Sequence, residues 1–405
     1  MSKNGQIELL APAGDLKRCM TAIDYGADAV YLGGQNYSLR SRASNFSIEQ
    51  IAEACAYAKA HHAAIHVTVN VIPHEEDFEG LEQYLRTLQE IGVHAVIEAS
   101  PAIMSLTRRC APELEIHCST QMSVTNACAA EYLSKHLGID RVVLARECTM
   151  EEVQAITAAS PVDTEAFIHG GMCVNISGRC TLSNRMTLRD ANRGGCAQSC
   201  RWMYRLYDQD QLVSGETDLY TMGSRDLSSA DEIAGLMAAG VSSLKIEGRM
   251  KTEYYVASIV SAYRHLIDEI KVQHGPLSEQ RMAYHRSQIA KGENRQTCDG
   301  FYQGIAGAES LIYHPNSDAD VNHGFLATVK EYDACTHTAV IETRNPMDTG
   351  MEIEVLSPGR DCQAFALEYM KNEQGEYLET SRVPMRLIAI NAPVDLHAGD
   401  ILRKG

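Results

Sequence analysis

The sequence predicts an α/β fold: a (β/α)8 TIM-like barrel with a cysteine-rich insertion, followed by a small C-terminal β-barrel domain. In the first part of the chain, short apolar runs alternate with amphipathic stretches about eight times, as in a parallel sheet with covering helices. In the last part, short alternating runs are separated by turn signals, as in a small antiparallel domain. We therefore expect a barrel over residues 1–272, a helical and irregular linker over 273–320 and a β-barrel over 321–405.

Strand-like and helical segments follow one another in order along the predicted barrel. The apolar runs that we interpret as its strands cover residues 7–10, 29–32, 64–71, 95–97, 114–117, 141–144, 165–168 and 244–246. The helical segments between them include residues 48–60, 78–91, 150–159 and 229–239, and glycines that end helices precede several strands, at Gly26, Gly92, Gly138 and Gly240. This order fits either a closed barrel or an open doubly wound sheet, and eight repeats favour the barrel.

The alternation is interrupted between residues 173 and about 215, in a segment rich in Gly, Asn, Ser, Arg and Cys. This segment follows a predicted strand, so it leaves the barrel at the end where barrel active sites form. A long segment without periodicity inside a compact domain is typical of a functional loop or of a bound metal. After a predicted helix at 254–270, strand-like runs resume at residues 325–329, 338–342, 351–355 and 386–389.

Composition and charge exclude several classes of protein. The 405 residues include 36 basic and 53 acidic side chains, giving a net charge of −17, so any contact with nucleic acid must come from a local basic surface. No apolar run approaches the roughly 18 residues of a membrane span, and the first residues do not resemble a signal peptide. We expect a cytoplasmic protein that binds neither membrane nor DNA.

The strongest chemical signal is the spacing Cys173-x6-Cys180-x15-Cys196-x3-Cys200 inside the insertion. Thiolates are soft ligands that suit iron–sulfur clusters or zinc. The close Cys pairs of zinc ribbons are absent, which favours an iron–sulfur cluster, with zinc as the alternative. The chain has 13 cysteines and no secretion signal, so a disulfide scaffold is a poor interpretation. Thiols without any ligand are the remaining alternative.

Charged and polar residues concentrate in the insertion and at the predicted ends of strands. Between Cys173 and Arg205 there are six arginines and one acidic residue, which predicts an anionic substrate at the barrel mouth, unless the arginines pair with acids elsewhere. We expect substrate binding by Asp15, Gln121, Arg179, Arg193, Arg201 and Arg249. We expect catalytic roles for Arg146, Glu147, His169, Lys245 and Glu247. For Lys245 and Glu247 the alternative is a buried ion pair that closes the barrel.

Taken together, these segments closely resemble the peptidase U32 family. The resemblance covers nearly the whole chain and rests on the motifs Glu8-Leu-Leu-Ala-Pro-Ala-Gly-Asp15, His117-Cys-Ser-Thr-Gln-Met-Ser-Val-Thr-Asn126, Arg141-Val-Val-Leu-Ala-Arg-Glu147, His169-Gly-Gly-Met-Cys173, Ser177-Gly-Arg-Cys180 and Lys245-Ile-Glu-Gly-Arg-Met-Lys251. Length and domain pair resemble a branch whose members support conversion of tRNA wobble uridine 34 to 5-hydroxyuridine without molecular oxygen, with prephenate as hydroxyl source. Related members hydroxylate a ribosomal RNA cytidine or ubiquinone.

The resemblance also implies a cofactor, a substrate and partners. Several family members carry a 4Fe–4S cluster; Cys173, Cys180 and Cys196 match the family's cysteine motif, and Cys200 is the expected fourth ligand. Many relatives have a cysteine where this chain has Ser228, which leaves the fourth ligand open. The implied partners are the anticodon region of tRNA and a paired U32-family subunit.

Two alternative functions stay open. The older family label, collagenase-like protease, suggests a peptidase, which requires a nucleophile with a base or a catalytic metal with an open position. His169 and Cys173 would be candidates for such a pair, although Cys173 is better explained as a ligand. The other alternative is a non-catalytic adaptor subunit of a hydroxylation complex.

Overall fold

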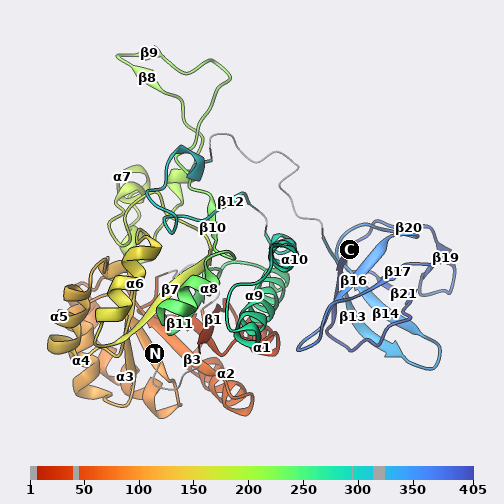
Figure 1. Ribbon diagram of the computed structural model, residues 1–405, viewed down its shortest axis with the longest axis horizontal. Helices are drawn as coiled ribbons and strands as arrows, with labels where there is room; N and C mark the ends of the chain where they lie inside the picture. Colours follow the sequence, from red (N-terminus) through yellow and green to blue (C-terminus); the bar gives the residue numbers. More distant parts are fainter. Residues whose placement is uncertain (1–6, 40–44, 294, 313–323) are drawn as a thin grey trace.

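The computed structural model describes residues 7–39, 45–293, 295–312 and 324–405, and its larger part is a closed barrel of eight parallel strands (Figure 1). Every strand pairs in parallel with the next, and β11 pairs with both β7 and β1, which closes the barrel. The strands are β1 (Glu8–Pro12), β2 (Ala29–Gly33), β3 (Ala64–Val69), β4 (Ala95–Glu98), β5 (Glu115–Cys118), β6 (Arg141–Val143), β7 (Asp163–Gly170) and β11 (Ser243–Ile246). All eight correspond to predicted runs, so the predicted barrel is confirmed.

Helices cover the outside of the barrel. They are α1 (Leu16–Asp24), α2 (Ile48–Ala60), α3 (Leu81–Glu90), α4 (Pro101–Cys110), α5 (Ala127–Leu137), α6 (Met150–Ala159), α8 (Ile233–Ala239) and α9 (Glu253–Gln273). Ser47 and Thr149 each begin a helix with a capping box. The predicted helix-stop glycines Gly138 and Gly240 follow α5 and α8 with φ of 64° and 83°, the left-handed conformation that glycine adopts at low cost. Among the described residues, no helix combines the length and apolar character needed to pass through a lipid bilayer.

Alternate residues of each strand face the helices or the barrel interior. The residues that face the helices form one large apolar core, to which Val67 and Val69 of β3 contribute. A much smaller apolar cluster contains Leu10, Tyr31 and Ile97. The buried residues of the strands also include charged and imidazole side chains. Because the barrel encloses so many polar groups, its interior can supply the floor of a site as well as a packed core.

The insertion after β7 has little regular structure. It contains α7 (Leu182–Thr187), two 3-10 turns, η3 (Ala191–Arg193) and η4 (Ser199–Arg201), and a hairpin of β8 (Tyr207–Asp208) and β9 (Gln211–Leu212). The hairpin projects away from the barrel (Figure 1). The chain then returns through β10 (Asp226–Ser228), which lies antiparallel to β7.

The segment that we predicted as a linker, residues 273–320, largely packs on the barrel where the structure describes it. Helix α10 (Glu279–Ala290) packs against α9, and β12 (Thr297–Cys298) extends the barrel sheet by pairing with β10. The Tyr302 hydroxyl donates to the Phe167 carbonyl at 2.6 Å. The helical part of this segment could be predicted from its sequence, and it forms α10. The formation of β12 depends instead on pairing with β10, which lies far away in the chain. Residues 313–320 lie outside the described part.

The C-terminal domain is an antiparallel sheet curved into half a barrel, with its own apolar core. Its strands are β13 (Phe325–Asp333), β14 (Thr338–Thr343), β16 (Glu352–Leu356), β17 (Gln363–Ala366), β18 (Met370–Lys371), β19 (Tyr377–Leu378), β21 (Leu387–Asn391) and β22 (Ile401–Lys404), with a separate pair β15 (Met347–Asp348) and β20 (Thr380–Ser381). It contacts the barrel through stacked rings of Tyr254 and Phe325, whose centroids lie 4.9 Å apart, and through Lys291 and Glu354 at 2.8 Å. The β-domain predicted from the sequence is confirmed.

Candidate functional site

A cavity of about 230 Å³ opens at the barrel mouth, beyond the carboxyl ends of the strands. Barrel strands supply its floor, and the loops after β3, β5, β6, β7 and β11 supply its walls. Eight of the residues that we predicted as functional line it: Gln121, Arg146, Glu147, Cys173, Cys180, Lys245, Glu247 and Arg249. We call this cavity the mouth pocket.

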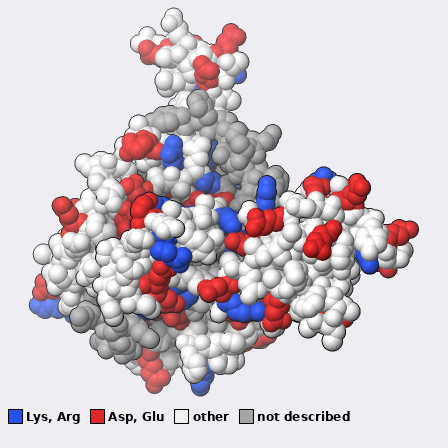
Figure 2. Space-filling model, turned by 45° about the vertical axis from the view of Figure 1, so that its right-hand side comes forward, with Lys and Arg blue, Asp and Glu red and all other residues white. Residues whose placement is uncertain are grey.

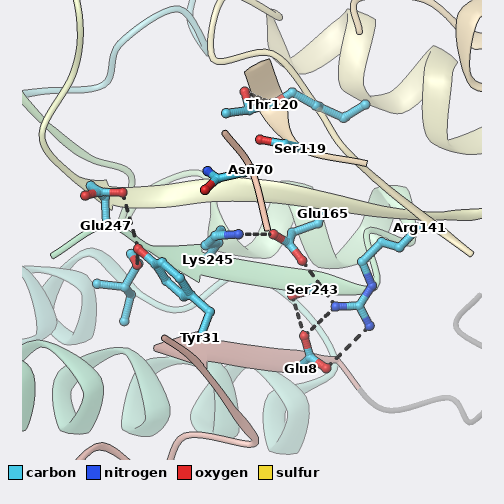
Figure 3. Close-up of polar contacts among 12 residues, drawn as sticks. Glu8, Tyr31, Asn70, Ser119, Thr120, Arg141, Glu165, Ser243, Lys245 and Glu247 are labelled. Atoms are coloured by element: carbon cyan, nitrogen blue, oxygen red, sulfur yellow. Dashed lines mark hydrogen bonds and ion pairs between the residues drawn. The ribbon is translucent and has the colours of Figure 1, made fainter. Parts of the chain in front are cut away.

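A chain of charged residues extends from the mouth pocket into the barrel, and Lys245 is the member that lines the pocket (Figure 3). The Lys245 ammonium lies 2.8 Å from one carboxylate oxygen of Glu165, and the Arg141 guanidinium lies 3.2 Å from the other. Arg141 also pairs with Glu8 at 2.6 Å, and the Ser243 hydroxyl donates to Glu8 at 2.7 Å. Lys245 and Glu165 are both buried. Two acids and two bases therefore balance one another along the barrel axis.

The electrostatic environment keeps Glu165 ionised. Burial alone would raise the pKa of this carboxyl group, but the charges of Lys245 and Arg141 and their hydrogen bonds lower the pKa below its usual value. The Lys245 ammonium also lies 4.5 Å from the centroid of the Tyr31 ring. The floor of the mouth pocket is consequently a fixed ammonium group held between a carboxylate and an aromatic face.

Lys245 and Glu247 do not form the ion pair that the sequence suggested as an alternative. Lys245 pairs with Glu165, while Glu247 accepts a hydrogen bond from the Tyr31 hydroxyl at 3.2 Å. Glu247 also lies 3.6 Å from the Arg146 guanidinium. Both residues still line the mouth pocket, but each has its own partners from other strands.

Arg146 and Glu147 connect the barrel to the insertion. The Arg146 guanidinium donates to the Gly171 carbonyl and lies 3.8 Å from the centroid of the Phe167 ring. The Glu147 carboxylate accepts hydrogen bonds from the backbone N–H of Ser177 at 3.0 Å and from its hydroxyl group. These contacts fix the start of the insertion as a wall of the mouth pocket.

Polar side chains that sequence reasoning missed complete the rim. Asn70 donates to the Gln121 side-chain oxygen at 2.7 Å, and the Ser119 hydroxyl donates to the same oxygen at 3.2 Å. Arg249 is buried and donates to the Thr68 hydroxyl at 2.8 Å. The missed polar residues are Tyr31, Thr68, Asn70, Ser119, Thr120, Asn175 and Ser177. Most of them stand at the end of a strand or just after it, the signal by which Gln121 was found.

Asp15 and His169, both predicted as site residues, lie outside the mouth pocket. Asp15 is the N-cap of α1, accepting a hydrogen bond from the backbone N–H of Arg18 at 2.9 Å, which is a structural role. His169 is buried against α9, with its Nδ1 3.3 Å from the Tyr263 hydroxyl. Burial lowers the pKa of His169 to about 3, so it is neutral at physiological pH. Neither side chain is therefore among the residues that line the mouth pocket.

The arginines of the insertion divide into paired and exposed groups. Arg193 pairs with Asp77 of η1 (Glu75–Phe78), and Arg201 lies 3.2 Å from Asp226. These two arginines therefore attach the insertion to the barrel. Arg179 is exposed and donates to the Ser123 hydroxyl at 3.4 Å. None of the three is among the residues that line the mouth pocket.

The four cysteines of the insertion lie near one another. Burial raises the pKa of Cys200, and the thiols of Cys173, Cys196 and Cys180 raise that pKa further by electrostatic repulsion. Cys173 and Cys180 line the mouth pocket, and the Asn175 amide donates to the Cys180 sulfur at 3.2 Å. Within the described ranges, however, no three His, Cys, Asp or Glu side chains are arranged so that they could hold a metal ion. The four thiols are chemically suitable ligands for a metal ion or an iron–sulfur cluster. In the structure, however, they are not arranged around a common centre.

Ser228, the residue that left the fourth ligand open in the sequence analysis, is in a different environment. Ser228 pairs with His169 across β10 and β7, and its side chain lies next to Glu293 and Tyr263. The structure therefore associates Ser228 with a group of buried polar side chains next to α9, and not with the four cysteines of the insertion.

Fold and site define a (β/α)8 barrel protein with a charged pocket at its mouth and a cysteine-rich insertion beside it. The chain belongs to peptidase family U32, because the model of that family matches residues 14–311 and the model of its C-terminal domain matches residues 321–403. The two matches together span the barrel and the β-domain.

Three relatives illustrate the range of the family. Over 98% of its length, the chain is 40% identical to tRNA hydroxylation protein P1 of Bacillus subtilis, of which it covers 94%. It is 40% identical to 23S rRNA 5-hydroxycytidine C2501 synthase of Escherichia coli over 67% of this chain and 41% of that protein. It is 33% identical to a collagenase of Porphyromonas gingivalis, over 73% of each chain.

Proposed function

We propose that this protein supports hydroxylation of uridine 34, the wobble base of tRNA, to 5-hydroxyuridine. The observation that carries the proposal is the 40% identity, across both domains, with a protein named for tRNA hydroxylation. A second relative is named for the synthesis of a hydroxylated pyrimidine in ribosomal RNA. The substrate class that we propose is therefore RNA, and the reaction is hydroxylation of a pyrimidine base.

We assign the mouth pocket to the hydroxyl donor, for which we propose prephenate, a dicarboxylate. Lys245 and Arg249 are buried cations in its lining, where the field of a charge is screened less than at the surface. Gln121 and Asn70 add neutral hydrogen-bonding groups at the rim. A cavity of about 230 Å³ suits one small organic acid or one base, and the remainder of an RNA would lie outside it.

Among the lining residues, Arg146 and Glu247 are the proposed catalytic pair. They lie 3.6 Å apart, and the Tyr31 hydroxyl donates to Glu247. A carboxylate with these partners can accept or return a proton without leaving the pocket. Glu147 acts differently in this proposal, because its hydrogen bonds to Ser177 keep the insertion at the pocket wall.

The cofactor that we propose is a 4Fe–4S cluster held by Cys173, Cys180, Cys196 and Cys200, with zinc as the alternative. When bound, such a cluster supplies one-electron transfer. The four thiols lie near one another, and two of them line the pocket. Binding would require them to close around the cluster. Anaerobic purification with iron, sulfide and zinc quantitation, repeated on the four Cys→Ala variants, tests this proposal.

The proposed function is tested by deleting the gene for this chain and measuring modified tRNA nucleosides by mass spectrometry in cells grown without oxygen. We expect loss of 5-hydroxyuridine and of nucleosides derived from it, with recovery by the wild-type gene. Glu247→Gln should fail to restore them, whereas Cys128→Ala, an exposed cysteine on α5, should restore them fully. An unchanged nucleoside pattern in the deletion strain contradicts the proposal.

Peptide hydrolysis is the second candidate, favoured by the collagenase relative and the family name. A peptidase of the Cys/His type needs a base next to its nucleophile. No histidine is among the described residues that line the mouth pocket, and His169 is buried behind it. Cleavage of denatured collagen that survives Cys196→Ala and is lost with a His169 substitution would favour this candidate.

A third role, as an adaptor subunit of a hydroxylation complex, makes a separate prediction. An adaptor would show activity only when mixed with its partner, for which a second U32-family chain is the candidate. Reconstitution of tRNA hydroxylation with this chain alone and with added cell extract separates the two cases.

A further inference from the structure

The insertion exposes apolar side chains beside the mouth pocket. Leu188 is 95% exposed, Met186 45% and Trp202 42%. Helix α7, which carries Met186, packs against η4, which directly precedes Trp202, so these residues belong to one compact part of the insertion. Exposed apolar side chains that gather in this way mark an interaction surface more often than scattered ones do.

Three arginines of the same segment have no partner in the part of the chain that the structure describes. The guanidinium groups of Arg185, Arg189 and Arg205 are exposed and form no hydrogen bond or ion pair with the described residues. In contrast, Arg193 and Arg201 are held by carboxylates. The insertion therefore presents three unpaired positive charges on a protein whose net charge is −17.

The positive segment ends where the hairpin begins. Residues 206–219 contain no Lys or Arg, and their acidic residues are Asp208, Asp210, Glu216 and Asp218. Figure 2 shows acidic side chains on this projecting hairpin, and on the barrel and C-terminal domain acidic and basic side chains are interspersed. An anionic partner would be repelled by the hairpin and attracted to the segment before it.

We propose that residues 174–205 form the surface on which single-stranded RNA docks beside the mouth pocket. Arg185, Arg189 and Arg205 bind phosphates, and the Trp202 ring stacks on an unpaired base. This inference rests on the proposed function, because it takes tRNA as the substrate. The structure favours RNA over a protein partner because the unpaired charges are all arginines, which match phosphate geometry, and stand next to an exposed aromatic ring.

The position of this surface explains how an RNA base could reach the entrance of the mouth pocket, next to a hydroxyl donor bound inside it. Residues Asn175 to Gly178 line the mouth pocket, and the chain continues directly into Arg179 and α7. An RNA loop held by the arginines would place an adjacent unpaired nucleotide at the pocket entrance. The other arginines of the segment, Arg193 and Arg201, keep the surface in place by their ion pairs with the barrel.

Trp202 is the only tryptophan in the chain, so its fluorescence reports on this surface directly. We would titrate the full-length, anaerobically purified protein with an RNA stem–loop that has the sequence of a tRNA anticodon arm with uridine at the wobble position. Stacking should quench the fluorescence as the RNA binds. A fully paired RNA duplex of the same length should bind more weakly and quench less.

The contribution of the three arginine charges to RNA binding is measured with a triple variant, Arg185→Gln, Arg189→Gln and Arg205→Gln. A plot of the logarithm of the RNA association constant against the logarithm of the salt concentration has a negative slope. Loss of three phosphate contacts should make this slope less steep by about 2. The matched control removes three exposed positive charges from the outer helices α2, α4 and α5, by Lys59→Gln, Arg109→Gln and Lys135→Gln. The control should leave the slope unchanged.

The stacking contribution is measured with a labelled RNA by fluorescence anisotropy. Trp202→Leu should weaken binding by about 5- to 150-fold, and Trp202→Phe should restore much of the affinity. Equal binding by the arginine variant and its control, or no quenching at RNA concentrations that saturate the anisotropy signal, would overturn the inference. It would also fail if the variants lost association with another protein while retaining RNA affinity.

Failure of this inference can be told apart from failure of the proposed function. If the arginine variant restores the modified nucleosides of the deletion strain as well as wild type does, the surface is wrongly assigned while the function stands. If the deletion strain keeps all its hydroxylated nucleosides, the proposed function itself fails, whatever the RNA titration shows.

Discussion

Replacing Glu165 by glutamine should destabilise the barrel strongly. The side chain is fully buried, and its two oxygens lie 2.8 Å from the Lys245 ammonium and 3.2 Å from the Arg141 guanidinium. Arg141 keeps Glu8 as a partner in the variant, but Lys245 pairs with no second carboxylate among the described residues. Removing one member of a buried ion pair costs about 3–5 kcal/mol, because it leaves a buried charge uncompensated. We expect a loss of that size in the free energy of unfolding.

The measurement is urea unfolding followed by circular dichroism, in a double-mutant cycle. Lys245→Met alone should cost less than Glu165→Gln, because Glu165 keeps Arg141 as a partner. The double variant Glu165→Gln/Lys245→Met has no uncompensated charge, so it should be more stable than the sum of the single losses predicts, by at least about 1 kcal/mol. Additive losses, or a loss below about 1 kcal/mol for Glu165→Gln, would refute the view that these charges act as one buried network.

The same residue predicts a pH dependence. The pKa of Glu165 is lowered in the folded protein, so the unfolded state binds its proton more readily. Glu165 therefore contributes stability that is present at neutral pH and is lost as the pH falls through the folded-state pKa. The urea midpoint of wild type should fall on acidification, and the fall should be smaller in Glu165→Gln.

Three further predictions concern other parts of the chain. Cys196→Ala should lose most of the iron of an anaerobic preparation, whereas Cys128→Ala should keep it; equal iron in both would contradict the assigned ligands. His66 is buried with both ring nitrogens unpartnered, and burial lowers its pKa well below the usual value; His66→Leu should therefore make stability depend less on pH between 7 and 5, measured by urea midpoints. Asp77→Asn should release Arg193 and increase protease cleavage within the insertion, while the melting of the barrel by circular dichroism stays nearly unchanged.

The barrel could be predicted because its signals are local. Each strand is a short apolar run, and glycines such as Gly138 and Gly240 end the helices before the next run. The short strand β12 could not be predicted in this way, because residues Thr297–Cys298 become a strand only by pairing with β10. The same holds for β10, whose place beside β7 is set by the return of the insertion.

The position of His169 shows why side-chain direction is harder to predict than the strand that carries it. Strict alternation along β7 puts Glu165, Phe167 and His169 on one side. The pairing of β7 with β11 shifts between Lys245 and Ile246, so that two residues of β7 face one of β11. Such a bulge redirects the side chains that follow it. His169 therefore packs against α9 instead of facing the mouth pocket.

Lys245 and Glu247 show that the ion-pair and hydrogen-bond partners of a side chain are also hard to predict from sequence. Their spacing along the chain indicates that they share one side, and both do line the mouth pocket. Spacing does not determine their partners, because Glu165 comes from β7 and Tyr31 from β2. The arginines of the insertion follow the same rule, since Asp77 and Asp226 lie far from Arg193 and Arg201 in sequence. A count of charges can therefore locate a site, but it does not show which charges are paired; in the insertion, the arginines without a partner among the described residues are Arg185, Arg189 and Arg205.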